Sequence, residues 1–337
     1  MRNVFVLIDG TRCTLASKTN IEAIYALSEA GGYRHHYQPG VGTYTQTKRR
    51  DEALAADIEG RAISVYQTLV EMQLNKQDRL YIFGYSRGAV IARTLAMCIA
   101  SKEQLIAAAQ GPPFKRTVPA QIEFLCLFEP VIGWPRRFKT YVANHEAVLE
   151  PKIKNYLELL ALEERGVLFR SDSYVASGKA ARKITELRRV SEAMPLEEKD
   201  KAAEALAVRK TRKAIWFPGM HGEIGGQNGR REIALHTLAT ALDELFAVSD
   251  AVGAEIEFPA EHLTAIKMML GGFIPMPPPR PVSKLKQVWD RIGQIWGRRC
   301  PPSEHFAQHI AHPLCAKFAP SVPGASDLPT YPDYKMM

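Results

Sequence analysis

Ser86 stands at the centre of a Gly-x-Ser-x-Gly pattern that runs from Gly84 to Gly88. Residues 79–83 before it are aromatic and branched and predict a short β-strand, and residues 89–99 after it are apolar and predict a helix. A tight turn between a strand and a helix holds such a serine in a strained backbone conformation, where it can act as a nucleophile. The glycines allow strand and helix to approach closely. The alternative is a glycine-rich β–α turn in another doubly wound fold.

A serine hydroxyl is a weak nucleophile, so this chemistry requires a base that takes its proton. His221 is the first candidate, because it follows a predicted strand at 213–217 and lies in a glycine-rich turn. A turn histidine that only bonds backbone is the alternative role. His312, which lies in the sequence His-Ile-Ala-His-Pro, competes with His221. His236 lies among apolar residues at helical spacing and is expected to be structural.

An acid must orient the base in such a site. Glu129 is the acid candidate, because it ends the predicted strand at 121–128. Glu223 and Asp9 are its rivals. A carboxylate that caps N–H groups at the end of a strand is the alternative role for Glu129.

Backbone N–H groups must stabilise the negative oxygen that forms during acyl transfer. The N–H of Arg87, directly after the nucleophile, is one expected donor, and the second is expected from Gly10 or Thr11. The latter pair follows a predicted strand at 4–8, and open parallel sheets place their ligands at the carboxyl ends of strands. This chemistry requires no metal and no organic cofactor, and we expect none.

Predicted strands alternate with predicted helices, which is typical of an α/β fold with a mainly parallel central sheet flanked by helices. The expected strands are 4–8, 34–38, 79–83, 121–128 and 213–217, and the expected helices are 21–30 (capped by Asn20), 51–75, 89–99 and 231–246. We expect one α/β-hydrolase-like domain over residues 1–337, with a helical insertion or cap at about 140–210 and a Pro-rich C-terminal extension at about 275–337. Segments near 153–165 and 262–274 are candidate lid helices.

The formal net charge of +8 favours anionic partners, including peripheral contact with an anionic membrane. The sequence has no zinc-finger spacing and no aromatic RNA-binding signature, so we expect no nucleic-acid partner. Five scattered cysteines indicate reduced thiols. The first residues predict a buried strand rather than a signal peptide, and no apolar window is long enough to span a membrane. We therefore expect synthesis in the cytoplasm, with any export by a signal-independent system.

Five segments together resemble the bacterial and fungal α/β-hydrolase domain family whose best-known members are the type VI secretion lipase effectors of the first class. These segments are residues 6–11, 20–21, 37–43, 83–89 and 216–226. The resemblance implies a phospholipase A-like serine esterase that cleaves lipid acyl esters through an acyl-enzyme. It also implies an immunity or secretion partner protein if the chain is an exported toxin.

The same resemblance implies a triad of Ser86, His221 and Glu129. The sequence departs from the family pattern at Glu129 and Glu223, where the family has aspartates, and each glutamate carries its carboxylate one methylene further from the backbone. These two departures leave open a catalytically weakened hydrolase-like binding module. A soluble esterase or thioesterase for small acyl groups is a further alternative, which differs in substrate.

Overall fold

Seven parallel strands form one sheet in the part of the chain that the structure describes. This structure is a computed structural model, and it describes residues 1–43, 58–100, 118–131, 153–164, 212–227, 231–271 and 309–311. The strands are β1 (Asn3–Ile8), β2 (Arg34–Gln38), β3 (Arg79–Tyr85), β4 (Gln121–Phe128), β5 (Ile153–Ala161), β6 (Arg212–Phe217) and β7 (His309–Ala311). Their order across the sheet is β2-β1-β3-β4-β5-β6-β7, so all carboxyl ends lie at one edge.

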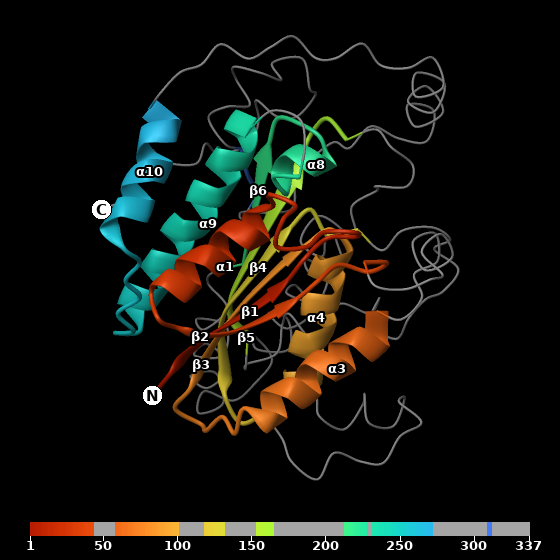
Figure 1. The fold of residues 1–337 in the computed structure, drawn as a ribbon, viewed down its shortest axis with the longest axis vertical. Helices are drawn as coiled ribbons and strands as arrows, with labels where there is room; N and C mark the ends of the chain where they lie inside the picture. The colour runs from red at the N-terminus through yellow and green to blue at the C-terminus, as the bar shows by residue number, and fades with distance from the viewer. Residues whose placement is uncertain are drawn as a thin grey trace, which may run out of the picture.

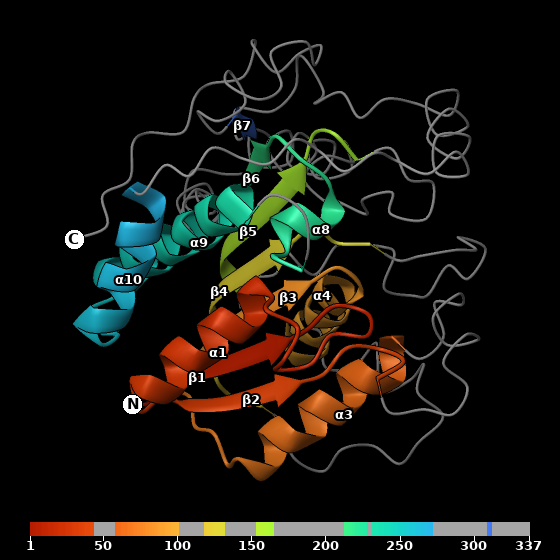
Figure 2. The same cartoon turned by 45° about the horizontal axis from the view of Figure 1, so that its top comes forward.

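Helices cover both faces of this sheet (Figure 1; Figure 2). The helices are α1 (Asn20–Ala30), α3 (Ile58–Glu71), α4 (Arg87–Ala100), α8 (His221–Ile224), α9 (Arg231–Ala251) and α10 (Ala260–Gly271). One face carries α3 and α4, and the other carries α1, α9 and α10. This three-layer arrangement is the expected α/β-hydrolase-like architecture. Among the described helices, none combines the length and hydropathy that a bilayer-spanning segment needs.

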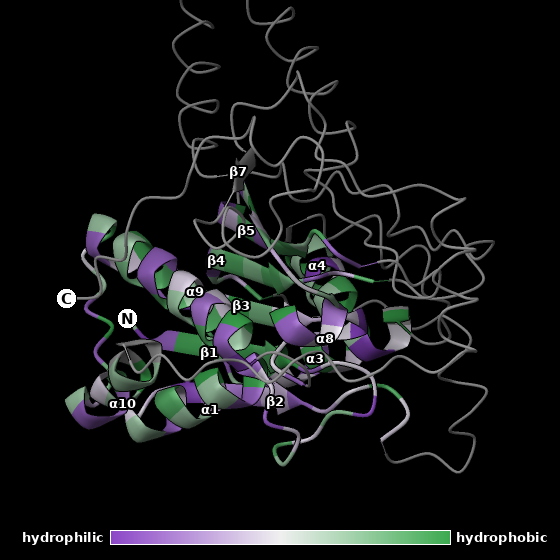
Figure 3. Cartoon of the chain, turned by 90° about the horizontal axis from the view of Figure 1, so that it is seen from above, coloured by the Kyte–Doolittle hydropathy of each residue, from purple (hydrophilic) through white to green (hydrophobic). Residues whose placement is uncertain are grey.

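The central strands are apolar on both sides because both faces of the sheet are buried. In β1, Val4 and Val6 pack in the core under α3 and α4, while Phe5 and Leu7 pack in the core under α1 and α9. Figure 3 shows the central strands as hydrophobic and the helices as mixed. The continuous apolar run at the start of the sequence therefore correctly predicted a buried strand.

The prediction of a helix near 153–165, within the expected helical insertion, is wrong. Residues 153–161 form β5, which lies between β4 and β6 in the middle of the sheet. The segment is rich in Leu and Glu, which favours a helix locally, but burial between two strands overrides that propensity. The remainder of the expected insertion lies outside the described residues.

Several other boundaries differ from the prediction. The N-cap of α1 is Thr19, whose side chain accepts a hydrogen bond from Glu22 N, and Asn20 is the first helical residue. The expected helix at 51–75 is described from Ile58 onward.

Most of the Pro-rich extension lies outside the described residues, apart from β7, which pairs with β6 at the edge of the sheet. The expected lid helix at 262–274 corresponds to α10, which packs against α9.

A buried polar cluster ties the helix after Ser86 to the middle of the sheet. Arg93 on α4 is fully buried, as are Tyr156 and Glu158 on β5. The Tyr156 hydroxyl donates a hydrogen bond to Glu158 and is also hydrogen-bonded to Arg93. Burial and the charge of Glu158 raise the pKa of Tyr156 well above its usual value. Because a buried charge requires partners, this cluster fixes α4 relative to β5.

The turn after Ser86 passes extremely close to the end of β1. A Cβ atom at Gly88 would lie 2.3 Å from the carbonyl oxygen of Asp9 and 2.4 Å from that of Ile8. A Cβ atom at Gly84 would lie 2.6 Å from the Cα atom of Ala89. Both positions therefore require glycine for steric reasons, as the sequence pattern indicated.

We expect Gly88→Ala to lower the free energy of unfolding by about 3 kcal/mol or more, because the backbone of β1 must move to admit the methyl group. Gly32→Ala is the matched control, since Gly32 has a φ of 69° but no atom within 4 Å of its Cβ position. The control is expected to cost about 1 kcal/mol from backbone strain alone. Urea unfolding measures both values. Equal losses in the two variants would contradict the steric explanation.

Candidate active site

Ser86 occupies a strained turn between β3 and α4. Its φ is 57°, a left-handed conformation that non-glycine residues rarely adopt. Hydrogen bonds from both sides hold it there: Ser86 N donates to Phe128 O at 2.9 Å, and Val131 N donates to Ser86 O at 3.1 Å. Such strain persists only where the surrounding structure enforces it, and it is concentrated at functional sites.

His221 lies directly against the serine. Its Nε2 atom is 2.8 Å from Ser86 Oγ, and both side chains are only 6% exposed. His221 is the first residue of α8, in the turn after β6. The fold thus brings together two residues that are 135 positions apart in the sequence. A hydroxyl that is hydrogen-bonded to an imidazole in this way can transfer its proton as it attacks a carbonyl carbon.

The turn that carries His221 is held by Tyr85 and Asn20. The Tyr85 ring stacks on the imidazole, with ring centroids 5.2 Å apart and an angle of 27° between the planes. Asn20 Nδ2 donates hydrogen bonds to Ile224 O at 3.0 Å and to Ala234 O at 3.1 Å, which joins α1 to α8 and α9. Sequence reasoning assigned Asn20 to a helix cap and gave Tyr85 no role.

Glu129 lies beside the serine turn, at the end of β4. It is fully buried and has a φ of 43°, so it is a second strained non-glycine residue at this edge. Its Oε2 atom accepts a hydrogen bond from Ala161 N at 2.6 Å, and its own N–H donates to Leu159 O at 2.8 Å. The carboxylate thus caps the end of β5, which is the alternative role expected from the sequence, at a position adjacent to the serine turn.

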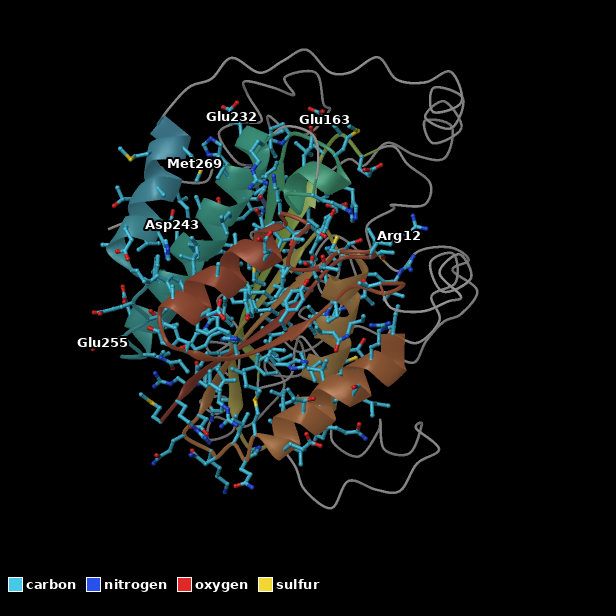
Figure 4. The ribbon with its side chains drawn as sticks, viewed as in Figure 1. Arg12, Glu163, Glu232, Asp243, Glu255 and Met269 are labelled. Atoms are coloured by element: carbon cyan, nitrogen blue, oxygen red, sulfur yellow. The ribbon has the colours of Figure 1, made fainter. Side chains whose placement is uncertain are left out.

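The other carboxylates have different partners. Glu223 Oε2 accepts from Met220 N at 2.8 Å within the turn of His221. Glu164, which sequence reasoning missed, accepts from the backbone N–H of His221 at 2.9 Å. Glu164 follows β5, so its position at the active edge could not be recognised while that segment was interpreted as a helix. Figure 4 shows Arg12 and Glu163, from the loops after β1 and β5, pointing away from the sheet near this edge.

Tyr85 is fully buried, and its hydroxyl lies within hydrogen-bonding distance of His221 O at 3.5 Å and of Gln227 Oε1 at 3.3 Å. Burial raises the pKa of Tyr85 well above its usual value, and the charges of Asp9, Glu129 and Glu164 raise it further. Tyr85 therefore stays neutral and serves as a hydrogen-bonding platform beneath the imidazole of His221.

Both groups of expected oxyanion donors lie next to Ser86. Arg87 is the first residue of α4. A Cβ atom at Gly10 would lie 3.4 Å from Ser86 Cβ and 2.6 Å from the Tyr85 ring, so the loop with Gly10 and Thr11 packs against Ser86 and Tyr85.

The structure brings neither of the other two candidate histidines to the Ser86 turn within the residues that it describes. His312 lies outside the described residues, and His236 lies on α9, where its carbonyl oxygen accepts a hydrogen bond from the Thr240 hydroxyl. Within the described residues, no group of His, Cys, Asp and Glu side chains is arranged to hold a metal ion.

The fold and the Ser86–His221 pair define an α/β-hydrolase-like domain. The chain matches the family described as "T6SS, Phospholipase effector Tle1-like, catalytic domain" over residues 2–111 and 109–244, which is more than half of its length. The chain belongs to this family, and the resemblance inferred from the sequence motifs is confirmed.

Individual relatives match only in part. Over 115 residues the chain is 33% identical to the "Uncharacterized protein YEL023C" of Saccharomyces cerevisiae, covering 28% of this chain and 17% of that protein. An uncharacterized protein from Pseudomonas aeruginosa has a similar structure, with a TM-score of 0.42, 16% identity and coverage of 86% of this chain and 52% of the other. The Tle1 effector bound to the VgrG spike of the type VI secretion system has a TM-score of 0.37, 16% identity, and coverage of 67% and 51%. The chain thus spans about half the length of these solved structures.

Asp9 gives the site a pH-dependent contribution to stability. Burial raises the pKa of Asp9 to about 6, although hydrogen bonds from Gly10, Tyr37 and Thr19 lower it. Because this pKa lies above the ordinary value, Asp9 favours the folded state below about pH 4, and this contribution is lost as the pH rises through 6. Relative to wild type, Asp9→Asn should therefore gain up to about 3 kcal/mol in free energy of unfolding between pH 4 and pH 7.

Asp78 provides a control of opposite sign. Its pKa is lowered, because hydrogen bonds from Arg2 and Asn75 outweigh the effect of burial. Asp78→Asn should therefore lose stability relative to wild type as the pH rises from 3 to 6. Urea unfolding at a series of pH values measures both differences, and a pH-independent difference for Asp9→Asn would contradict the assignment.

Proposed function

We propose that this chain is a serine esterase that cleaves phospholipid acyl esters. The observation that carries the proposal is the 2.8 Å contact between Ser86 Oγ and His221 Nε2 at a strained strand–helix turn. Membership of the Tle1-like phospholipase effector family supports the substrate class. The net charge of +8 supports binding to an anionic membrane surface.

In the proposed mechanism, Ser86 Oγ attacks the acyl carbonyl carbon while His221 Nε2 takes the serine proton. The carbonyl oxygen becomes an oxyanion and accepts hydrogen bonds from backbone N–H groups of Arg87 and of the loop after β1. His221 then donates its proton to the ester oxygen, and the lysophospholipid leaves as an alcohol. Water, activated by His221, attacks the resulting acyl-enzyme and releases the fatty acid, which restores Ser86.

Glu129 is proposed as the acid that orients His221. The Nδ1 atom of His221 is buried, so its N–H requires an acceptor in the protein. Glu129 lies between Ser86 and His221 in the chain, which is the order of triad residues in α/β hydrolases, and it adjoins the serine turn. Glu164 also fits that order and contacts the backbone of His221, so it is the second candidate. Glu223 and Asp9 do not fit the order.

Labelling with a fluorophosphonate probe tests the Ser86–His221 pair. We expect the wild-type protein to be labelled, Ser86→Ala not to be labelled, and His221→Ala to be labelled at least about 10³-fold more slowly, since an unactivated serine reacts poorly. His236→Ala is the matched control and should label normally. His312→Ala tests the competing base. Rapid labelling of His221→Ala would contradict the assigned role of His221.

The acid is identified by comparing Glu129→Gln with Glu164→Gln. Glutamine keeps the size and the acceptor oxygen but cannot stabilise an imidazolium ion, so the variant of the true acid should lose about 10²–10⁴-fold in kcat on a soluble ester. The other variant should lose less than about 10-fold. Glu223→Gln should likewise lose less than about 10-fold in kcat. If Glu129→Gln retains full turnover, Glu129 is not the acid.

The substrate class is tested with lipid vesicles. We expect fatty acid release from vesicles that contain phosphatidylglycerol, and a loss of vesicle binding between 50 and 500 mM salt that short soluble esters do not show. Turnover of short soluble esters without any activity on vesicles would support a soluble esterase instead. Vesicle binding that is insensitive to salt would contradict the electrostatic contact.

Delivery by a type VI secretion system is part of the same proposal and derives from the family description. The expected result is that the protein appears in the culture medium only when the secretion system is intact. Export that is independent of the secretion system would contradict this part.

A further inference from the structure

Asp9 is a fully buried carboxyl group that the proposed triad does not use. Its Oδ1 atom accepts a hydrogen bond from Gly10 N at 2.7 Å. Its Oδ2 atom accepts from the Thr19 hydroxyl at 3.0 Å and from the Tyr37 hydroxyl at 2.8 Å. These donors belong to the loop after β1, the N-cap of α1, and β2. The carboxylate therefore joins three elements directly beside the nucleophile turn.

Packing leaves the loop after β1 little freedom to shift. Gly10 lies against the Tyr85 ring, and a Cβ atom at Gly40 would lie 1.6 Å from Gly10 O. Backbone hydrogen bonds add to this confinement, since Arg12 N donates to Val41 O at 3.0 Å and Gly40 N donates to Cys13 O at 3.0 Å. The position of the loop is thus fixed by packing, and the orientation of its peptide groups depends on hydrogen bonds.

Hydrogen bonds set those directions on both sides of Gly10. The Gly10 N–H is directed to Asp9, so it does not point at a substrate. The Gly10 carbonyl oxygen accepts from Cys13 N at 2.9 Å. In a trans peptide the C=O of one residue and the N–H of the next point in opposite directions, so this bond also orients the N–H of Thr11. The two candidates for the second oxyanion donor are thereby distinguished in favour of Thr11.

We propose that Asp9 is the positioning residue of the oxyanion loop: it holds Gly10 so that the Thr11 N–H, together with the Arg87 N–H, binds the oxyanion that forms at Ser86. This inference rests on the proposed function. Asp9 acts through the backbone and touches neither the substrate nor His221. A carboxylate is suited to this role because it accepts from three donors at once, which a neutral side chain of similar size cannot do.

The hold on Gly10 depends on the ionised form of Asp9. Once protonated, the carboxyl group must donate one hydrogen bond instead of accepting all three. The titratable groups that face it from the neighbouring elements are Glu22 on α1, Cys13 in the loop, Tyr37 on β2 and Tyr85 on β3. Protonation of Asp9 should therefore reduce turnover as the pH falls through about 6, the pKa to which burial raises this group.

The test measures kcat and KM on a short-chain p-nitrophenyl ester. Asp9→Ala should lower kcat by about 10²–10³-fold, as for loss of one oxyanion donor, with KM changed by less than about 3-fold. Asp9→Asn keeps an acceptor for the Gly10 N–H and should recover at least about 10-fold of that loss. Asp78→Asn, which alters a buried aspartate near the amino ends of the strands, is the matched control and should retain the wild-type kcat.

The acidic limb of the pH profile separates positioning from general structural support. In wild type, log kcat/KM should fall more steeply below about pH 6 than in Asp9→Asn, because Asp9 is one of the groups that must lose a proton. In Asp9→Asn this contribution is absent, so the slope should be smaller by about 1. Tyr37→Phe removes a hydrogen bond that lowers the pKa of Asp9, so it should move the Asp9 step to higher pH.

Each outcome decides the proposal. A kcat of Asp9→Ala within about 3-fold of wild type, or an unchanged slope in Asp9→Asn, overturns the positioning role. If Asp9→Ala does not fold, Asp9→Asn and Tyr37→Phe carry the same test. A wild-type protein with no Ser86-dependent turnover overturns the proposed function itself, and this inference with it. Normal Ser86-dependent turnover combined with an unaffected Asp9→Ala overturns the inference alone.

Discussion

The close approach of the turn that carries Ser86 to the end of β1 is the constraint on which the rest of the site depends. Gly88 lies over the carbonyl oxygens of Ile8 and Asp9, and Gly10 lies against Tyr85. No larger residue fits at Gly88 without displacing β1. The serine and the loop expected to supply an oxyanion donor are therefore held at van der Waals distance by this close packing.

Polar and aromatic side chains then fix the positions of the other groups in the site. Tyr85 supports the imidazole of His221, and Asn20 holds the turn that carries it. Several carboxylates are buried here, and each of those described above is hydrogen-bonded to backbone or hydroxyl donors. Such an arrangement costs stability, as the raised pKa of Asp9 shows, in exchange for fixed directions of N–H groups. Stability and function are expected to oppose each other at Asp9 for this reason.

The pairing of Ser86 with His221 was predictable from the sequence, because local patterns mark the turns that carry both residues. Gly84 and Gly88 are glycines because backbone atoms leave no room for a Cβ atom there. Gly225, in the glycine-rich turn after 213–217, is a glycine because the Tyr85 ring leaves no room. The strand β5 was not predictable, because residues 153–165 together are rich in Leu and Glu, which favours a helix, and only the neighbouring strands make residues 153–161 a strand. Missing β5 also concealed Glu164. The role of Asn20 depends on contacts with residues more than 200 positions away, which no local pattern reveals.

The most direct test of the central claim is to trap the covalent intermediate. The protein would be mixed with a slowly hydrolysed activated acyl ester, quenched in acid, digested and analysed by mass spectrometry. The account predicts an acyl adduct on the peptide that contains Ser86, formed and lost at rates that match turnover. An adduct on any other residue, or turnover with no adduct on Ser86, would contradict the account.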